Sequence, residues 1–137
     1  MVDAQVVDQL AGLALFADLG RPQLTAVAHT FSEESYPPGQ RLLRQGFTGT
    51  GFYVILDGEV SVGIDGAERV RLGKGEFFGE MSIILGEPPV ADITALTPLR
   101  VLHLPGPDLQ RFLIGHPTVL YRMLQSVARR LARANAR

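Results

Sequence analysis

Glycine spacing limits the fold of this chain more than any other feature. Ten of its 15 glycines fall between Gly46 and Gly86. Strand-length runs separated by glycine-bearing turns are typical of antiparallel β-structure. We therefore expect a β-roll, sandwich or barrel over residues 31–104. Its strands should follow the short apolar or alternating runs at Phe52–Leu56, Val60–Ile64, Val70–Leu72, Ile93–Leu96 and Leu99–Leu104.

Two Asp-Gly pairs, Asp57-Gly58 and Asp65-Gly66, separate neighbouring runs. Asp-Gly is a strong hairpin signal because both residues tolerate a positive φ. We expect a hairpin at each pair.

Both ends of the chain have helical periodicity. Apolar residues recur at three- and four-residue spacing from Val6 to Ala14, and a second short pattern runs from Leu24 to Ala28. Near the other end, Asp108 is placed to cap a short helix over Gln110–Ile114, and Pro117 suits the first turn of a long final helix. The predicted fold is mainly β: an antiparallel β-roll of the double-stranded β-helix or jelly-roll type with flanking helices.

The 137 residues, 46% of them hydrophobic, suit one globular domain. We expect residues 1–30 to hold N-terminal helices, residues 31–104 the roll, and residues 105–137 the C-terminal helices of that single domain.

Composition excludes several classes of function. The chain has no cysteine, so disulfides, thiolate catalysis and cysteine-based metal sites are excluded. It shows neither a signal-peptide pattern nor a run of about 20 apolar residues, and we expect a cytoplasmic protein without membrane contact. No catalytic triad stands out, and His29, His103 and His116 lack metal-ligand spacing. We expect no enzyme activity, no metal and structural roles for the histidines.

The final helix carries an apolar stripe and many arginines. From Arg100 to Arg137 there are seven arginines and one acid, Asp108. Such a tail is a solvated helix face or a contact for nucleic acid or acidic partners. The stripe could dock on the roll or pair with a second copy of the chain, and we expect a homodimer. It consists of Leu120, Met123, Leu124, Val127 and Leu131.

The segment Gly75–Ala95 is the one that suggests chemistry. A strand should end near Phe78, and a short helix should follow from Gly79 to about Leu85. A glycine that opens a helix leaves N–H groups free for an anion such as a phosphate. Glu80 would then suit a hydroxyl of the attached sugar. The alternative is a simple strand–turn–helix corner in which Glu80 stabilises the helix N-terminus.

The string FGEMSIILGEPP within this segment resembles the phosphate-binding cassette of cyclic nucleotide-binding domains. The likeness extends, in order, along nearly the whole chain. Its other parts are LALFADL at Leu13–Leu19, the turn at Tyr36–Gln40 followed by Gly46, the stretch Tyr53–Val60, and a tail from His116 that is similar to the long helix of catabolite-activator-type regulators.

The resemblance implies a set of ligand contacts. Gly79 would present amides to the cyclic phosphate, and Glu80 would hold the ribose 2′-hydroxyl. The other expected contacts are Met81, Ser82 and Val90 in the cassette, Val70 and Leu72 on the pocket wall, and Arg130 and Asn135 near the base. The ligand would be a cyclic nucleotide, cAMP ahead of cGMP, and no other cofactor is expected.

Two residues depart from the family pattern. The family's cassette has an arginine for the phosphate where this chain has Pro89, and no arginine lies between Gly75 and Leu99. Asp92 would repel a phosphate if it pointed inward. Three residues ahead of the cassette could supply the missing charge or could simply face solvent: Arg69, Arg71 and Lys74.

Three hypotheses of function remain. The first is a non-enzymatic sensor module in which Pro89 weakens or alters cyclic nucleotide binding, or which takes a different small ligand. The second is a ligand-free interaction or dimerisation domain. The third is the effector half of a Crp/Fnr-type transcription regulator, which without a DNA-binding domain would not contact DNA by itself.

Overall fold

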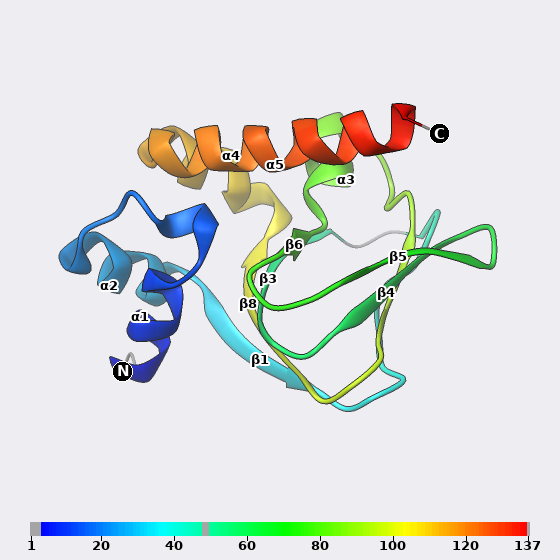
Figure 1. Ribbon diagram of the computed structural model, residues 1–137, viewed down its shortest axis with the longest axis horizontal. Helices are drawn as coiled ribbons and strands as arrows, with labels where there is room; N and C mark the ends of the chain where they lie inside the picture. Colours follow the sequence, from blue (N-terminus) through cyan, green and yellow to red (C-terminus); the bar gives the residue numbers. More distant parts are fainter. Residues whose placement is uncertain (1–3, 48–49, 137) are drawn as a thin grey trace. The chain divides into compact units, whose positions relative to one another are not determined.

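The computed structural model describes residues 4–47 and 50–136 (Figure 1). The chain divides into two compact units. One unit, called here the roll, is residues 30–109, and the other, the helical unit, combines the residues before 30 with those after 109.

The roll consists of two antiparallel sheets of four strands each. Sheet A contains, in spatial order, β1 (Ser32–Tyr36), β8 (Leu99–Pro105), β3 (Gly51–Asp57) and β6 (Phe77–Phe78). Sheet B contains β2 (Arg41–Leu43), β7 (Asp92–Ala95), β4 (Val60–Ile64) and β5 (Ala67–Leu72). Each of the five predicted runs forms a strand, so the expected β-roll is confirmed.

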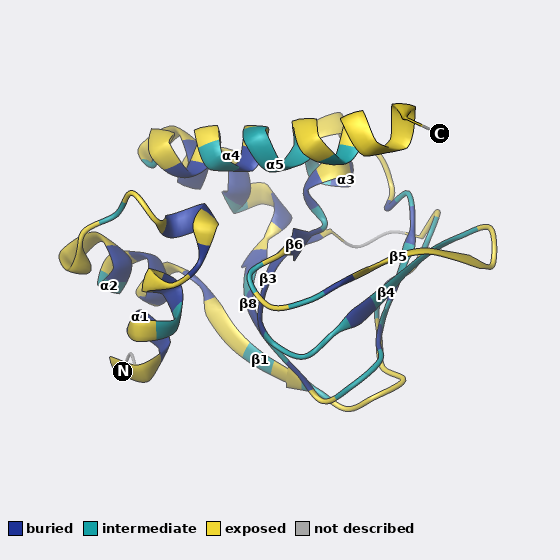
Figure 2. Cartoon of the chain, viewed as in Figure 1, coloured by how far each residue is buried: buried dark blue, intermediate teal, exposed yellow. Residues whose placement is uncertain are grey.

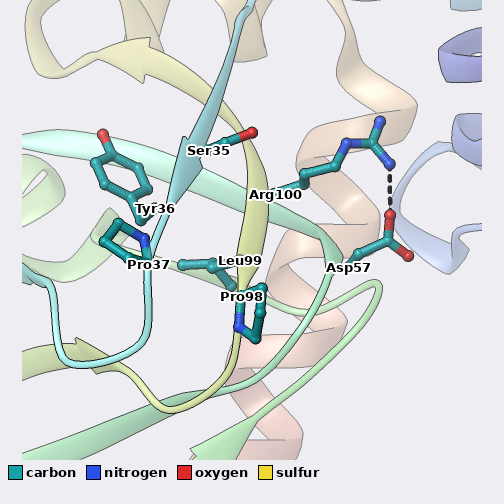
Figure 3. A pocket seen from close by; sticks show the side chains of 7 residues that line it. All are labelled: Ser35, Tyr36, Pro37, Asp57, Pro98, Leu99 and Arg100. Atoms are coloured by element: carbon teal, nitrogen blue, oxygen red, sulfur yellow. Dashed lines mark hydrogen bonds and ion pairs between the residues drawn. The ribbon is translucent and has the colours of Figure 1, made fainter.

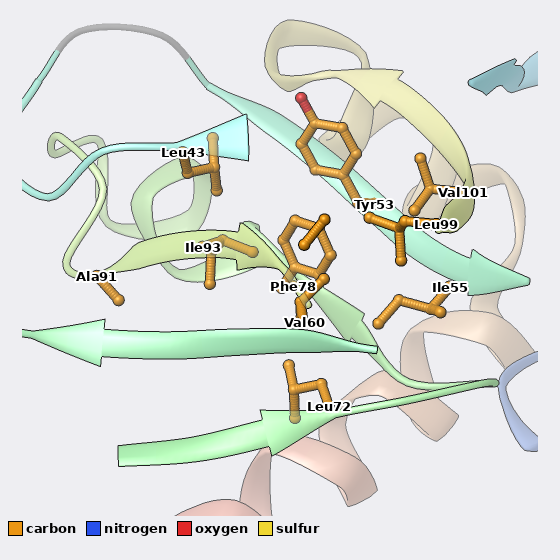
Figure 4. Close-up of a cluster of buried hydrophobic side chains, with 11 residues drawn as sticks. Leu43, Tyr53, Ile55, Val60, Leu72, Phe78, Ala91, Ile93, Leu99 and Val101 are labelled. Carbon is orange, nitrogen blue, oxygen red and sulfur yellow. The ribbon is translucent and has the colours of Figure 1, made fainter. Parts of the chain in front are cut away.

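A hydrophobic core fills the space between the two sheets (Figure 4). Sheet A contributes residues such as Ile55 and Val101, and sheet B contributes residues such as Val60 and Ile93. Alternate residues of β7 are buried, as expected for a strand with one face on a core. In β8 the neighbours Val101 and Leu102 are both buried, so this strand has buried side chains on both faces. Strand β3 is buried along nearly its whole length (Figure 2).

One of the two predicted hairpins is correct. Asp65 (φ 54°) and Gly66 (φ 81°) form the two-residue turn between the paired strands β4 and β5. The hairpin at Asp57-Gly58 is wrong, because β3 pairs only with β6 and β8 among the described strands, whereas β4 lies in the other sheet. Gly58 instead takes a positive φ of 99° at the corner where the chain changes sheets.

The helical unit contains α1 (Ala4–Ala11), the 3-10 turn η1 (Ala14–Phe16), most of α2 (Arg21–Thr30), the end of α4 (Gly106–Gly115) and α5 (Pro117–Asn135). Pro117 opens α5, as predicted. The beginning of α5 packs against η1, where Met123 is only 2% exposed. Arg122 donates two hydrogen bonds to the Asp18 carboxylate, at 2.8 and 3.0 Å.

Helix α4 begins earlier than predicted. It starts at Gly106, so Asp108 lies inside its first turn and does not precede the helix as a cap. Gly106 is buried, and a Cβ there would collide with the Thr50 side chain. The close approach of Thr50 explains why a glycine opens this helix. None of the described helices is both long and apolar enough to span a membrane.

Candidate functional site

The cassette begins with a backbone turn that only glycine fits. Gly79 stands before α3 (Glu80–Leu85) with φ 94° and ψ −8°. This is the left-handed region, which side chains other than glycine rarely adopt. A Cβ at this position would also collide with the carbonyl oxygen of Gly51. The start of α3 is therefore fixed against the first residue of β3.

Glu80 and Ser82 are the two buried polar residues of α3. Glu80 is 3% exposed in the first turn, where a carboxylate is favoured by the helix dipole. The Ser82 hydroxyl donates to the Gly79 carbonyl at 3.3 Å, and the Ser82 carbonyl accepts the N–H of Glu87 at 3.0 Å. No buried side-chain nitrogen or oxygen among the described residues lacks a hydrogen-bond partner. The cassette thus holds a buried carboxylate in a fixed position.

The opposite face of α3 is apolar and exposed. Met81 is 49% exposed, and Ile84 and Leu85 are exposed to a similar or greater extent. Met81, one of the predicted ligand residues, therefore lies on the solvent side of the helix and not beside Glu80.

Both departures from the family pattern hold one loop in place. The Pro89 carbonyl accepts the N–H of Gly46 at 2.8 Å, and Asp92 Oδ1 accepts the N–H of Gln45 at 2.8 Å. Ile93 points into the core, so Asp92 next to it points outward by the alternation of β7. The phosphate repulsion considered for an inward Asp92 therefore does not arise from this geometry.

The three basic residues ahead of the cassette are exposed. Arg71 pairs with Glu68 at 3.2 Å on the outer side of β5. Hydrogen bonds from Ser61 and from Arg71 lower the pKa of the Glu68 carboxyl. Arg69 and Lys74 are likewise exposed. All three match the solvent-facing interpretation of the sequence.

The predicted pocket wall is present in part. Leu72 is buried in the core, while Val70 on the same face of β5 is 49% exposed and Val90 is half-buried. Arg130 and Asn135 lie on α5 in the helical unit, and their contact with a base stays a prediction.

A second feature escaped sequence reasoning altogether. A surface hollow of about 420 Å³ lies where β1, β3 and β8 meet at the end of sheet A away from Gly51 (Figure 3). Arg100 borders it and pairs with Asp57 and Glu33, which raise the pKa of its guanidinium, with the Glu33 hydrogen bond as the main cause. Only the strand register brings these residues together, so no sequence motif marks them. The ion pairs already neutralise Arg100, and we assign the hollow no ligand.

Comparison with known proteins identifies the family. The sequence model of the cyclic nucleotide-binding domain matches residues 33–116. A cyclic nucleotide-gated potassium channel of Mesorhizobium japonicum is 33% identical over 110 residues, which are 80% of this chain and 30% of the channel.

Solved structures agree with this match. The catabolite activator protein of Thermus thermophilus superposes with a TM-score of 0.79 at 29% identity, over 90% of this chain and 60% of that one. The N-terminal domain of a transcriptional regulator from Streptomyces coelicolor has a TM-score of 0.67 at 34% identity, over 94% and 93% of the two chains.

The chain spans between 9% and 58% of the length of the first curated relatives it matches. The family is a regulatory module, which confirms the predicted sensor role. The matched residues include the whole cassette, both of its departures and every strand except the first residue of β1. This chain belongs to the cyclic nucleotide-binding domain family.

Proposed function

We propose that this chain is a regulatory sensor module that binds cAMP weakly at Gly79–Ser82 and has no catalytic activity of its own. The observation that carries the proposal is the buried Glu80 behind the left-handed Gly79, an arrangement suited to a ribose hydroxyl next to a phosphate. Likeness to a CRP-like cAMP-activated global transcriptional regulator of Mycobacterium tuberculosis favours cAMP over cGMP. The cytoplasm is the proposed location.

The affinity should be low because the phosphate loses its cationic partner. Pro89 stands where the family has arginine, and proline offers neither a side-chain donor nor an N–H. Removing one partner of a buried, hydrogen-bonded charge pair costs about 2–5 kcal/mol, or roughly 30- to several-thousand-fold in affinity. We therefore expect binding in the micromolar to millimolar range.

Thermal unfolding with added cAMP tests the proposal. A ligand that binds only the folded state stabilises it by about 1.4 kcal/mol when present at about ten times its Kd. The melting temperature should rise with cAMP in the original chain and in Glu87→Gln, an exposed control next to α3. Glu80→Gln should abolish the rise while remaining folded. No rise at millimolar cAMP in the original chain would overturn the proposal.

The ligand-free dimerisation domain is the second candidate, and one observation favours it. Leu120, Leu124 and Leu131 are exposed on α5, with Leu124 60% exposed. Together with the half-buried Val127 they follow the alternating four- and three-residue spacing of a coiled-coil seam. Met123, part of the predicted stripe, is instead buried in the helical unit. We propose that the seam pairs with a second copy of the chain.

Sedimentation analysis tests the dimer. Leu124→Glu should convert a dimer to monomer without loss of helix signal, because it places a charge in the seam. Thr118→Glu adds the same charge to the other side of α5 and should leave the dimer intact. A monomeric original chain, or equal effects of the two variants, would refute the pairing. The third candidate, the effector half of a Crp/Fnr-type regulator, draws support from the Streptomyces coelicolor match.

A further inference from the structure

Three stacked rings line the inner wall of sheet A and end beside the cassette. His103, Tyr53 and Phe78 occupy one row across β8, β3 and β6. The His103 and Tyr53 ring centres are 4.7 Å apart, and those of Tyr53 and Phe78 are 4.8 Å apart. Phe78 immediately precedes Gly79, so the row leads from the imidazole to the glycine that stands before α3.

A carboxylate holds the imidazole at the far side of this row. His103 Nδ1 lies 3.3 Å from Glu34 Oε2 on β1. The Tyr36 hydroxyl, also on β1, donates a short hydrogen bond to the other oxygen of Glu34. Burial and the Glu34 charge raise the pKa of Tyr53, and burial and the Glu34 contact raise that of Tyr36. Glu34 therefore contacts His103 on one side and the neutral Tyr36 phenol on the other, while the neutral Tyr53 ring stacks on the imidazole.

His103 also approaches the cassette through Gly51. A Cβ on Gly51 would lie 2.7 Å from His103 Nε2, so the imidazole occupies the space of the missing side chain. The carbonyl of the same Gly51 packs against Gly79. A single backbone residue thus separates the free edge of the imidazole from the predicted phosphate site.

The arginines of the described strands lie away from the inner wall. Side chains alternate between the two faces of a strand. Arg71 on β5 pairs with Ser61 on β4, next to the core pair Val60 and Leu72, and so points outward. Arg100 lies between the inward Leu99 and Val101 and also points outward. Arg41 pairs with Thr94, and Arg69 is exposed at the irregularity in the pairing of β4 with β5, so none of the four arginines on the described strands is buried at the inner wall. His103 is the described strand residue that can bring positive charge to this wall.

Resting on the proposed function, we infer that His103, held by Glu34, makes cAMP binding at the cassette depend on protonation. Histidine side chains gain charge between about pH 8 and pH 5. A protonated imidazole would supply part of the charge that the arginine supplies elsewhere in the family. Because backbone separates it from the phosphate, the gain should be about tenfold in affinity and not the full effect of a direct contact.

Calorimetric titration with cAMP between pH 8.0 and 5.5 tests the inference, since an ordinary exposed carboxyl, with a pKa of about 4, stays ionised across this range. The original chain and His29→Gln, an exposed control on α2, should bind about tenfold more tightly at pH 5.5. His103→Gln should bind independently of pH, at the affinity of the original chain at pH 8.0. Glu34→Gln removes the carboxylate that holds the imidazole, should reduce the gain in affinity at pH 5.5, and serves as the second variant if His103→Gln does not fold.

The outcomes separate the two proposals. Equal cAMP affinity at both pH values in the original chain, or an unchanged pH dependence in His103→Gln, would overturn the role of His103 and leave the proposed function standing. A uniform loss of affinity in His103→Gln with the pH dependence intact would show a purely structural role and also overturn it. Absence of binding at every pH would overturn the proposed function together with this inference.

Discussion

Replacing Gly79 by alanine should destabilise the fold far more than the same change at another glycine with positive φ. Gly79 (φ 94°) and Gly39 (φ 87°) both adopt left-handed backbone conformations. They differ in their surroundings. A Cβ on Gly79 would collide with the Gly51 carbonyl, whereas a Cβ on Gly39 would meet nothing within 4 Å.

The expected losses of stability follow from the left-handed backbone at both glycines and from the collision at Gly79 alone. A residue other than glycine in the left-handed region costs about 1–2 kcal/mol, and this should be the whole effect of Gly39→Ala. Gly79→Ala adds the collision, which must move either β3 or α3, and forced shifts of packed structure cost about 1–3 kcal/mol more. We therefore expect a loss of about 1–2 kcal/mol for Gly39→Ala and about 2–5 kcal/mol for Gly79→Ala.

Urea unfolding of the two variants and the original chain measures both losses. If the two variants lose the same free energy of unfolding within about 0.5 kcal/mol, the close contact of Gly79 with Gly51 is refuted. The cost would then come from the left-handed backbone alone, which both glycines share. A Gly79→Ala chain that is as stable as the original would contradict the left-handed turn itself.

Two further predictions follow from the polar contacts. Asp92→Ala should lower the free energy of unfolding by about 1–2 kcal/mol, because it removes the acceptor of the Gln45 N–H. Asp92→Asn keeps an acceptor, and its cAMP affinity should change less than twofold. An affinity gain of tenfold in Asp92→Asn would show that the carboxylate faces the ligand after all. Arg122 lowers the pKa of Asp18 in the folded chain, so the pair stabilises the fold above the ordinary carboxyl pKa of about 3.9 and loses this effect as the pH falls. Arg122→Gln should therefore unfold more easily than the original chain at pH 7 and equally at pH 2.5; a difference that persists in acid would refute the ion pair as its cause.

Local sequence patterns predicted most of the elements because the turn chemistry is explicit. Gly66 and Pro117 mark a hairpin and a helix start correctly, since each acts within a few residues of its own position. The error at Gly58 has a physical reason. Both a hairpin and a corner between sheets need a positive φ, and only the partners of β3 and β4 distinguish them.

Only those features of the candidate site that depend on neighbouring residues in the sequence could be predicted. Gly79 and Glu80 could be identified from the string that contains them, because a helix start is a local feature. The direction of Asp92 could not, since the Pro88-Pro89 pair hides the strand register and the partner Gln45 is 47 residues away. The contacts of His103 depend on pairing between β1, β3 and β8, which no spacing in the sequence reveals.

Titration of the isotope-labelled chain with cAMP, monitored through the backbone amide signals, tests the proposed nucleotide site most directly. We expect the signals of Gly79–Ser82 to shift progressively and to saturate with a midpoint in the micromolar to millimolar range. Saturation at nanomolar cAMP would contradict the argument that Pro89 removes the main phosphate contact. Unchanged cassette signals at several millimolar cAMP would contradict the claim that Gly79 and Glu80 still form a nucleotide site.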